Sequence, residues 1–146
     1  MPERPFRFAL AGQGNIARKY AATLRNVPGA CLAGAIAVDQ ARLAAFCAEH
    51  GIPAFAATLA ELAEKAEFDA AILGVPSGLH GRLAAEAAAL GKHVLTEKPL
   101  EISVEKADAM IAACARAGVR LGCAFQQRAD PRNIAVRQAL QGGALG

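Results

Sequence analysis

A glycine-rich segment near the amino terminus has residue types and spacing suited to binding a phosphorylated cofactor. It follows an apolar run, precedes a helical pattern and reads Gly12-Gln13-Gly14-Asn15-Ile16-Ala17, or G-x-G-x-x-A. Gly12 allows a tight turn, Gly14 lets the backbone approach a pyrophosphate, and the small Ala17 lets the helix pack close to the strand, so that helix amides face the anion. A glycine turn can also simply join a strand to a helix. With a second strand expected about 20 residues further on, the segment favours dinucleotide binding.

An acidic residue at the end of the second expected strand would support NAD, because a carboxylate there accepts a hydrogen bond from the adenosine ribose. Asp39 is the only candidate at that place. The same residue stands directly before an expected helix, where an aspartate caps the helix by accepting a hydrogen bond from a backbone amide. Both interpretations of Asp39 stay open.

A second candidate segment follows the fourth expected strand, at the sheet edge where ligands of open parallel sheets bind. It reads Val75-Pro76-Ser77-Gly78-Leu79-His80. His80 would stand in the first turn of a helix, whose dipole disfavours the imidazolium and keeps a neutral ring that can donate or accept a hydrogen bond. The alternatives are an ordinary turn and cap at Pro76 and Ser77, and a surface histidine without a role.

A third candidate segment, Thr96-Glu97-Lys98-Pro99, follows the fifth expected strand. It brings a carboxylate, an ammonium group and a rigid proline together at the same sheet edge. A solvated loop with one Glu and one Lys is the alternative.

Apolar runs that alternate with helical patterns must position these segments. Short runs bounded by Gly, Pro or capping residues predict strands at 6–11, 31–38, 54–55, 70–75, 93–96 and 120–125. Apolar residues at 3.6-residue spacing predict helices at 16–25, 40–50, 59–65, 79–90, 104–117 and 131–141. Expected N-caps are Asp39, Thr58, Ser77 and Ser103, and expected left-handed C-terminal residues are Gly51, Gly91 and Gly118. Strands that are apolar throughout and alternate with helices predict an α/β fold, a doubly wound parallel sheet in three layers.

Composition limits the classes of function. The 146 residues, 54% of them apolar and 20% charged, are enough for one domain with its own core. The 16 basic and 13 acidic residues are spread along the chain, which argues against nucleic acid as a partner. No apolar run approaches the roughly 18 residues of a spanning helix, and no signal peptide is evident, so we expect a cytoplasmic protein without a membrane partner. The four cysteines lack zinc-ligand or redox spacing, which predicts reduced thiols and no metal site.

Four segments together resemble the amino-terminal domain of the glucose-fructose oxidoreductase, inositol dehydrogenase and MocA (Gfo/Idh/MocA) family. In chain order they are GQGNIA, VPSGLH, GKHVLTEKPL and AFQQR, and EKP is the most specific part. The resemblance covers essentially the whole chain and implies a Rossmann domain with strand order 3-2-1-4-5-6. It also implies a nicotinamide-dependent oxidoreductase acting on a secondary alcohol of a sugar, cyclitol or sugar derivative. The segment Ser77-Gly78-Leu79-His80 is similar to the matching segment of family members that oxidise nucleotide-linked aminosugar acids.

The resemblance implies roles for individual residues. In the family the EKP glutamate contacts the nicotinamide-side ribose and the lysine reaches the substrate hydroxyl, so these roles fall on Glu97 and on Lys98 as the catalytic residue. The following proline is often in cis, so a cis Lys98–Pro99 bond is expected. Arg128 is expected, like Lys98, beside the substrate. The expected cofactor contacts are Gly12, Gln13, Gly14, Asn15, Ile16, Asp39, Val75, Pro76, Ser77, His80, Glu97, Lys98 and Gln126.

One departure from the family pattern concerns the choice of cofactor. The family's ribose-binding acid falls on Ala37, and Asp39 falls on the helix-capping position. Ala37 removes the carboxylate that would repel a 2′-phosphate, but no arginine stands beside it to attract one, since Arg42 lies a turn into the helix. NAD and NADP both stay open, with NAD slightly favoured by default.

A second departure concerns the end of the chain. Residues 143–146 correspond to the junction where family members enter a second, mostly antiparallel domain, which supplies most of the substrate pocket and the oligomer interface. The resemblance therefore implies that residues 1–146 are the cofactor half of a homo-oligomeric parent enzyme and bind the cofactor without efficient turnover. The alternative is a stand-alone, non-catalytic dinucleotide-binding or regulatory module. An exposed apolar patch over the last helix would argue against that alternative.

Overall fold

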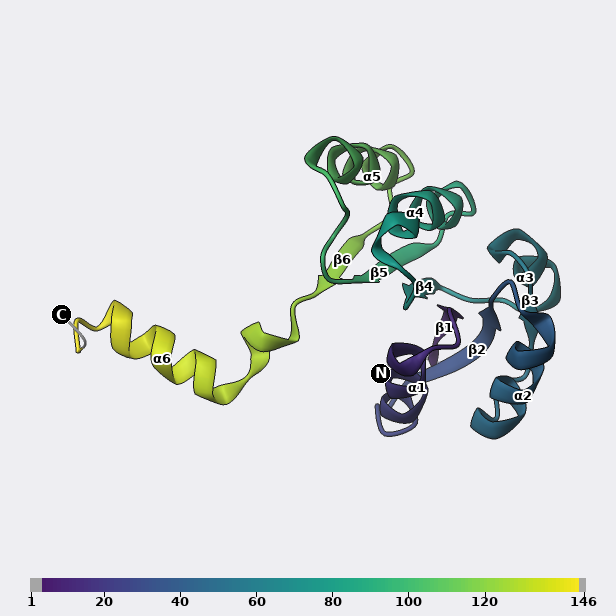
Figure 1. The fold of residues 1–146 in the computed structure, drawn as a ribbon, viewed down its shortest axis with the longest axis horizontal. Helices are drawn as coiled ribbons and strands as arrows, with labels where there is room; N and C mark the ends of the chain where they lie inside the picture. The colour runs from purple at the N-terminus through teal and green to yellow at the C-terminus, as the bar shows by residue number, and fades with distance from the viewer. Residues whose placement is uncertain (1–3, 145–146) are drawn as a thin grey trace.

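The computed structural model describes residues 4–144 and shows a parallel sheet with helices on both faces (Figure 1). The strands are β1 Phe6–Ala11, β2 Ala30–Ile36, β3 Phe55–Ala56, β4 Ala70–Leu73, β5 His93–Glu97 and β6 Leu121–Ala124. The α-helices are α1 Asn15–Leu24, α2 Gln40–His50, α3 Leu59–Lys65, α4 His80–Ala89, α5 Val104–Arg116 and α6 Pro131–Gln141. The sheet order is β3-β2-β1-β4-β5-β6, and all its pairs are parallel. The predicted fold class and strand order are confirmed.

Element boundaries agree with the sequence except near strand ends and at one helix start. The second and fourth strands end two residues earlier than predicted, at Ile36 and Leu73. Ser77 does not cap α4, because Ser77–Leu79 form a short 3-10 helix, η1, and α4 begins at His80. The Leu79 amide donates to the Pro76 carbonyl at 2.9 Å, an i to i+3 bond that tightens the chain before the helix.

The other predicted helix ends are confirmed by their hydrogen bonds and backbone angles. Side chains cap α2, α3 and α5 at their amino ends, namely Asp39, Thr58 and Ser103. Glycines with positive φ follow α2, α4 and α5, namely Gly51, Gly91 and Gly118.

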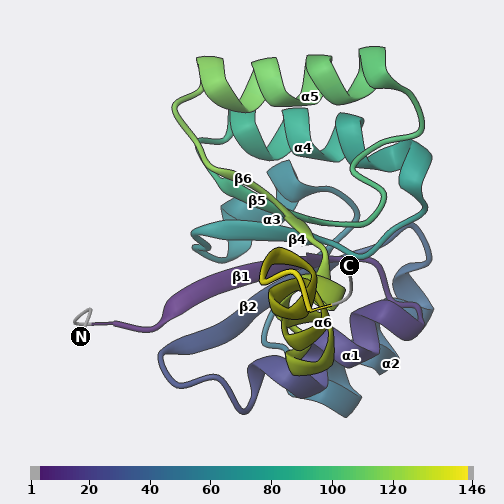
Figure 2. The same cartoon turned by 90° about the vertical axis from the view of Figure 1, so that its left-hand side faces the viewer.

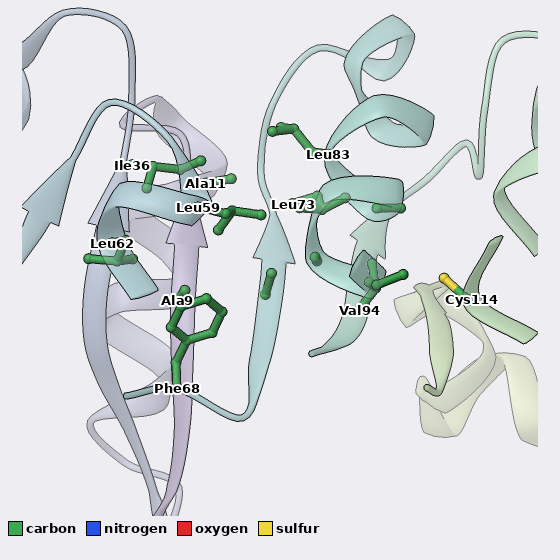
Figure 3. Packing of buried hydrophobic residues seen from close by; sticks show 14 of the residues in the cluster. Ala9, Ala11, Ile36, Leu59, Leu62, Phe68, Leu73, Leu83, Val94 and Cys114 are labelled. Atoms are coloured by element: carbon green, nitrogen blue, oxygen red, sulfur yellow. The ribbon is translucent and has the colours of Figure 1, made fainter. Parts of the chain in front are cut away.

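The core lies on both faces of the sheet. Figure 2 shows α4 and α5 on one side of the strands and α1 and α2 on the other. The cluster under α3, α4 and α5 includes Ala9, Leu62, Phe68, Leu73, Leu83, Val94 and Cys114 (Figure 3). The cluster under α1 and α2 includes Leu10, Ala17, Ala21, Leu43, Phe46 and Ile72. Burial of these apolar side chains fixes the strands, and with them the loops at the sheet edges.

The last helix, α6, is the exception to this packing. It follows a second 3-10 helix, η2 (Gln126–Ala129), and projects away from the sheet and its helices (Figure 1). None of its residues is buried, and Val136 and Leu140 are more than half exposed. One helical turn separates these two residues, so they share a face of α6.

The cysteines and the lengths of the helices bear on two further expectations from the sequence. All four cysteines are free thiols, of which Cys47 and Cys114 are buried, as the spacing predicted. Within residues 4–144, no helix has the length and apolar character needed to cross a membrane. The predicted domain junction at 143–146 lies partly outside the described residues.

Candidate functional site

The glycine loop between β1 and α1 has a geometry that only glycine can provide at its first position. Gly12 has a φ of 109°, and a Cβ on it would lie 2.4 Å from the Gly74 carbonyl oxygen at the end of β4. Its amide donates to the Ile36 carbonyl at 2.8 Å, which ties the loop to the end of β2. At Gly14, by contrast, a Cβ would meet open space. The loop is therefore fixed on its inner side and open on its outer side, where a ligand can approach the backbone.

Helix α1 begins without a side-chain cap. The helices α2, α3, α5 and α6 each have a capping side chain that accepts a backbone amide, whereas Gly14 at the N-cap of α1 has none; α4, which continues from the 3-10 helix η1, also lacks one. The Gln13 side-chain oxygen beside it is buried and has no hydrogen-bond partner in the part of the chain that the structure describes. Unpaired polar groups at a helix amino terminus suit an anionic ligand with hydroxyl groups, so the residues present fit a dinucleotide.

At the end of β2, Asp39 acts as the helix cap. Its Oδ1 accepts the Arg42 amide at 3.0 Å. The Gln40 side chain donates to the carbonyls of Ala37 and Ala56 and so joins the ends of β2 and β3. Ala37 is partly exposed at this corner, and Val38 beside it is almost fully exposed. Of the two interpretations of Asp39, the geometry supports capping, and its expected contact with the cofactor stays a prediction.

His80 is fully buried at the start of α4, so it is not the surface histidine of the alternative interpretation. Its Nε2 lies 3.1 Å from the Val75 carbonyl oxygen, and its Nδ1 lies 3.1 and 3.3 Å from those of Pro99 and Leu100. The ring thus connects the loop after β4 to the loop after β5. In this conformation the buried ring holds the two loops, and the expected contact of His80 with the cofactor stays a prediction.

Glu101 makes a second connection between the same two loops. Its carboxylate accepts the amides of Ile102 and, at 3.0 Å, of Gly81 in α4. These backbone hydrogen bonds, with Ile102 the stronger influence, lower the pKa of Glu101, so the carboxylate stays ionised and keeps both contacts near neutral pH.

The segment after β5 carries the expected charged pair. Glu97 ends the strand, partly buried, and its Oε1 accepts the Tyr20 hydroxyl of α1 at 2.7 Å. Lys98 is exposed directly after it, and the Lys98–Pro99 bond is cis, as expected. The loops after β1, β4 and β5 therefore lie at one edge of the sheet, the carboxyl edge of the parallel strands.

Gln126 and Arg128 lie on η2, after β6. Both are exposed, and the Arg128 guanidinium stacks over the Phe125 ring at 5.8 Å. Because η2 follows β6, these side chains also begin at the carboxyl edge, but no buried cluster fixes them. Their expected contacts with cofactor and substrate stay predictions.

Tyr20 is the residue at this edge that the sequence interpretation missed. It is the only tyrosine in the chain, and it lies one helical turn after Ile16 on the inward face of α1. A lone phenol on the apolar face of the helix that follows the glycine loop was the available signal, because a buried hydroxyl needs a polar partner.

The family model described as an oxidoreductase family with an NAD-binding Rossmann fold, Gfo/Idh/MocA, matches residues 6–125. The chain belongs to the Gfo/Idh/MocA oxidoreductase family. The family's cofactors are nicotinamide dinucleotides, which agrees with the dinucleotide expected from the glycine loop.

Individual relatives agree with the family. The chain is 31% identical over 140 residues to 1,5-anhydro-D-fructose reductase of Ensifer adhaerens and 30% identical over 145 residues to scyllo-inositol 2-dehydrogenase (NAD(+)) of Bacillus subtilis. These alignments cover 96% and 99% of this chain but 42% of each relative. The WlbA dehydrogenase of Bordetella pertussis, solved in complex with NADH and UDP-GlcNAcA, is 33% identical and has a TM-score of 0.90 over 98% of this chain and 44% of its own. The chain spans less than half the length of these relatives.

Proposed function

We propose that the chain binds a nicotinamide dinucleotide at the carboxyl edge of its sheet and is the cofactor half of an oxidoreductase that acts on a secondary alcohol. The observation that carries the proposal is the start of α1, where an uncapped helix, an unpaired Gln13 oxygen and open space at Gly14 occur together. Membership of an oxidoreductase family supports it.

Each part of the carboxyl edge has a separate task in this proposal. The amides of Gly14, Asn15 and Ile16 hold the pyrophosphate, and the end of β2 receives the adenosine. Glu97 holds the nicotinamide-side ribose, with Val75, Pro76, Ser77 and Gln126 around the cofactor. When bound, the nicotinamide supplies the hydride chemistry, and the chain supplies placement.

Lys98 has the catalytic role in the proposal. Its side chain is exposed, and its backbone is held at the edge between Glu97 and the His80-bound loop. In its unprotonated form the amine there can accept the proton of the substrate hydroxyl as the alcohol is oxidised, and the resulting ammonium can return that proton in the reverse reaction. In an enzyme that contains this domain, Lys98→Ala should reduce kcat by about 100-fold or more and leave the Kd for NADH within about twofold. Lys92→Ala, at the opposite edge, is the matched control and should change neither value. Unchanged turnover in Lys98→Ala would contradict the role.

The substrate in this proposal is a sugar, a cyclitol or a sugar derivative. The relatives are named for such compounds. The segment Ser77-Gly78-Leu79-His80 favours a nucleotide-linked aminosugar acid as the substrate, which agrees with the complex of WlbA with UDP-GlcNAcA. The exposed apolar face of α6, with Val136 and Leu140, supports a second domain that covers this helix and carries the oligomer interface, rather than a stand-alone module. Reduction of NAD with scyllo-inositol and with UDP-GlcNAcA separates the two substrate classes in such an enzyme.

Titration of the 146-residue chain with NADH and with NADPH tests cofactor binding. We expect saturable binding at one site and no efficient turnover. Gly14→Val is the matched variant, because a Cβ at position 14 has no protein atom within 4 Å and the added side chain grows from that open space. It should weaken binding at least tenfold and leave the melting temperature within about 2 °C, since no core contact changes. Failure of the wild-type chain to bind either dinucleotide would refute the proposal.

A further inference from the structure

We propose that Tyr20 is a positioning residue that holds the Glu97 carboxylate in place for the nicotinamide-side ribose. The inference rests on the proposed function, because it concerns how one of the expected cofactor contacts is oriented. Tyr20 itself does not have to contact the cofactor.

The hydrogen bond between the two side chains joins elements that are far apart in the sequence. Tyr20 lies in α1, Glu97 ends β5, and the hydroxyl donates to Oε1 at 2.7 Å, a short bond to a charged acceptor. Their positions also agree with the sheet, because both side chains lie on the face that α1 covers, where Leu95, two residues before Glu97, packs against the α1 and α2 cluster. The contact therefore follows from the fold and is not an accident of two flexible side chains.

The phenol is well suited to a fixed role as donor. Burial, and then the hydrogen bond to Glu97, raise the pKa of Tyr20 above its usual range. The hydroxyl therefore keeps its proton throughout the pH range of ordinary enzymes. Its ring packs at the margin of the α1 and α2 cluster, which restricts the direction in which the hydroxyl points.

The backbone of Glu97 is held separately from its carboxylate. Its carbonyl oxygen accepts the Thr96 hydroxyl at 3.2 Å and lies 3.7 Å from the Cys123 sulfur, and Thr96 is fully buried. With the backbone fixed by these groups, Tyr20 is the contact that selects the direction of the carboxylate.

The geometry leaves one carboxylate oxygen available for a ligand. Oε1 is occupied by Tyr20, whereas Oε2 makes no protein hydrogen bond among residues 4–144. A ribose hydroxyl can therefore donate to Oε2 without displacing Tyr20. Because the glycine loop leads directly into α1, the helix that carries Tyr20, α1 then orients both the pyrophosphate site and the ribose site.

Three ligands of increasing length separate this role from a general effect on the fold. ADP lacks the nicotinamide-side ribose, ADP-ribose contains it, and NADH adds the nicotinamide. We expect Tyr20→Phe, which keeps the ring, to weaken NADH and ADP-ribose about three- to tenfold, the range for loss of one hydrogen bond. The affinity for ADP should stay unchanged, and the melting temperature should fall by only a few degrees, as expected for one lost hydrogen bond.

A double-mutant cycle on the 146-residue chain completes the test. In a Glu97→Ala background, Tyr20→Phe should have no further effect on ADP-ribose binding, because its only route to the ligand is through Glu97. Equal weakening of ADP, or full additivity of the two substitutions, would overturn the role of Tyr20. Binding of all three ligands that is insensitive to Tyr20→Phe would also overturn it. Failure of the wild-type chain to bind any of the three ligands is a different result, which refutes the proposed function itself.

Discussion

The two edges of the sheet differ in the surroundings of their unpaired polar groups. At the amino edge, Asp69 accepts both terminal nitrogens of Arg4 at 2.8 Å and the Arg7 amide at 2.8 Å, and the Arg7 guanidinium pairs with Glu67 at 2.7 Å. These charges pair with one another, and the buried Arg7 Nε, which makes no hydrogen bond to any described residue, still lies 3.7 Å from an Asp69 oxygen within the same cluster. At the carboxyl edge, Gln13 has an unpaired buried oxygen, and α1 begins without a cap.

This difference shows where the molecule is prepared for a ligand. Unpaired polar groups cost stability, so they persist where an external partner can satisfy them. Both edges contain charged residues and, in the described part of the chain, a buried polar atom without a hydrogen bond. At the amino edge that atom lies within a cluster of ion pairs, whereas at the carboxyl edge the Gln13 oxygen lies beside the uncapped start of α1.

Gly12→Ala should have the largest effect, because it damages the carboxyl edge itself. The new Cβ would lie 2.4 Å from the Gly74 carbonyl oxygen at a φ of 109°, so the loop must move. We expect a loss of about 2–4 kcal/mol in the free energy of unfolding and loss of detectable NADH binding. Urea denaturation and calorimetric titration measure the two effects.

Gly29→Ala is the matched control at the amino edge. Gly29 precedes β2, also has a positive φ of 78°, and has open space where a Cβ would stand. The substitution should cost about 1 kcal/mol from backbone strain and leave the NADH affinity of the folded protein unchanged. An equal loss of NADH affinity in both variants would remove the distinction between the edges.

His80→Leu should have the next largest effect. Loss of the ring's contacts leaves buried carbonyls without their partner and costs about 1–3 kcal/mol. Because the ring connects the loops after β4 and β5, NADH binding should weaken as well. Unfolding and binding measured on the same preparation separate the two effects. Wild-type stability in His80→Leu would show that the ring does not hold the loops.

Ala37→Asp should sharpen the choice of cofactor at the end of β2. A carboxylate there can accept the 2′-hydroxyl of NADH and repel the 2′-phosphate of NADPH. We expect the wild-type chain to prefer NADH by less than about tenfold, and the variant to weaken NADPH binding by a further tenfold or more, about 1.4 kcal/mol. Competition between the two dinucleotides measures the ratio. If Ala37→Asp leaves the ratio of the NADH and NADPH affinities unchanged, the adenosine ribose does not bind beside residue 37.

Asp69→Asn, at the amino edge, should change stability in a pH-dependent way and leave binding alone. The Arg4 hydrogen bond holds the pKa of Asp69 well below its usual range. A lowered folded-state pKa gives stability that is present above the unfolded value of about 4 and is lost as the pH falls further. We therefore expect the variant to be about 1 kcal/mol less stable at pH 7, with a smaller difference at pH 3. Unfolding at both pH values checks this expectation, and a difference that grows towards low pH would contradict it.

Most of the fold could be predicted from the sequence because its signals are local. The glycine loop, the caps of α2, α3 and α5, and the apolar strands each depend on residues close together in the chain. The strand order came from the family resemblance, since apolar patterns alone do not specify which strands are neighbours.

The site was less predictable because two of its contacts join distant segments. His80 meets carbonyls that lie 19 and 20 residues away, and Tyr20 meets Glu97 77 residues away. A histidine in a first helical turn has the same local sequence whether it is exposed or buried. The contact between Tyr20 and Glu97 requires α1 to cover the sheet face on which the Glu97 side chain of β5 lies, and no short motif encodes that arrangement.

Amide chemical-shift mapping during titration with NADH is the most direct test of the difference between the two edges. We expect saturable shifts in the glycine loop at 12–17, in the segment 75–80 and at Glu97 and Lys98. We expect no comparable shifts at 4–7, 67–69 and 92–93. Shifts centred on the amino edge, or no saturable shifts at either edge, would contradict a dinucleotide site at the carboxyl edge.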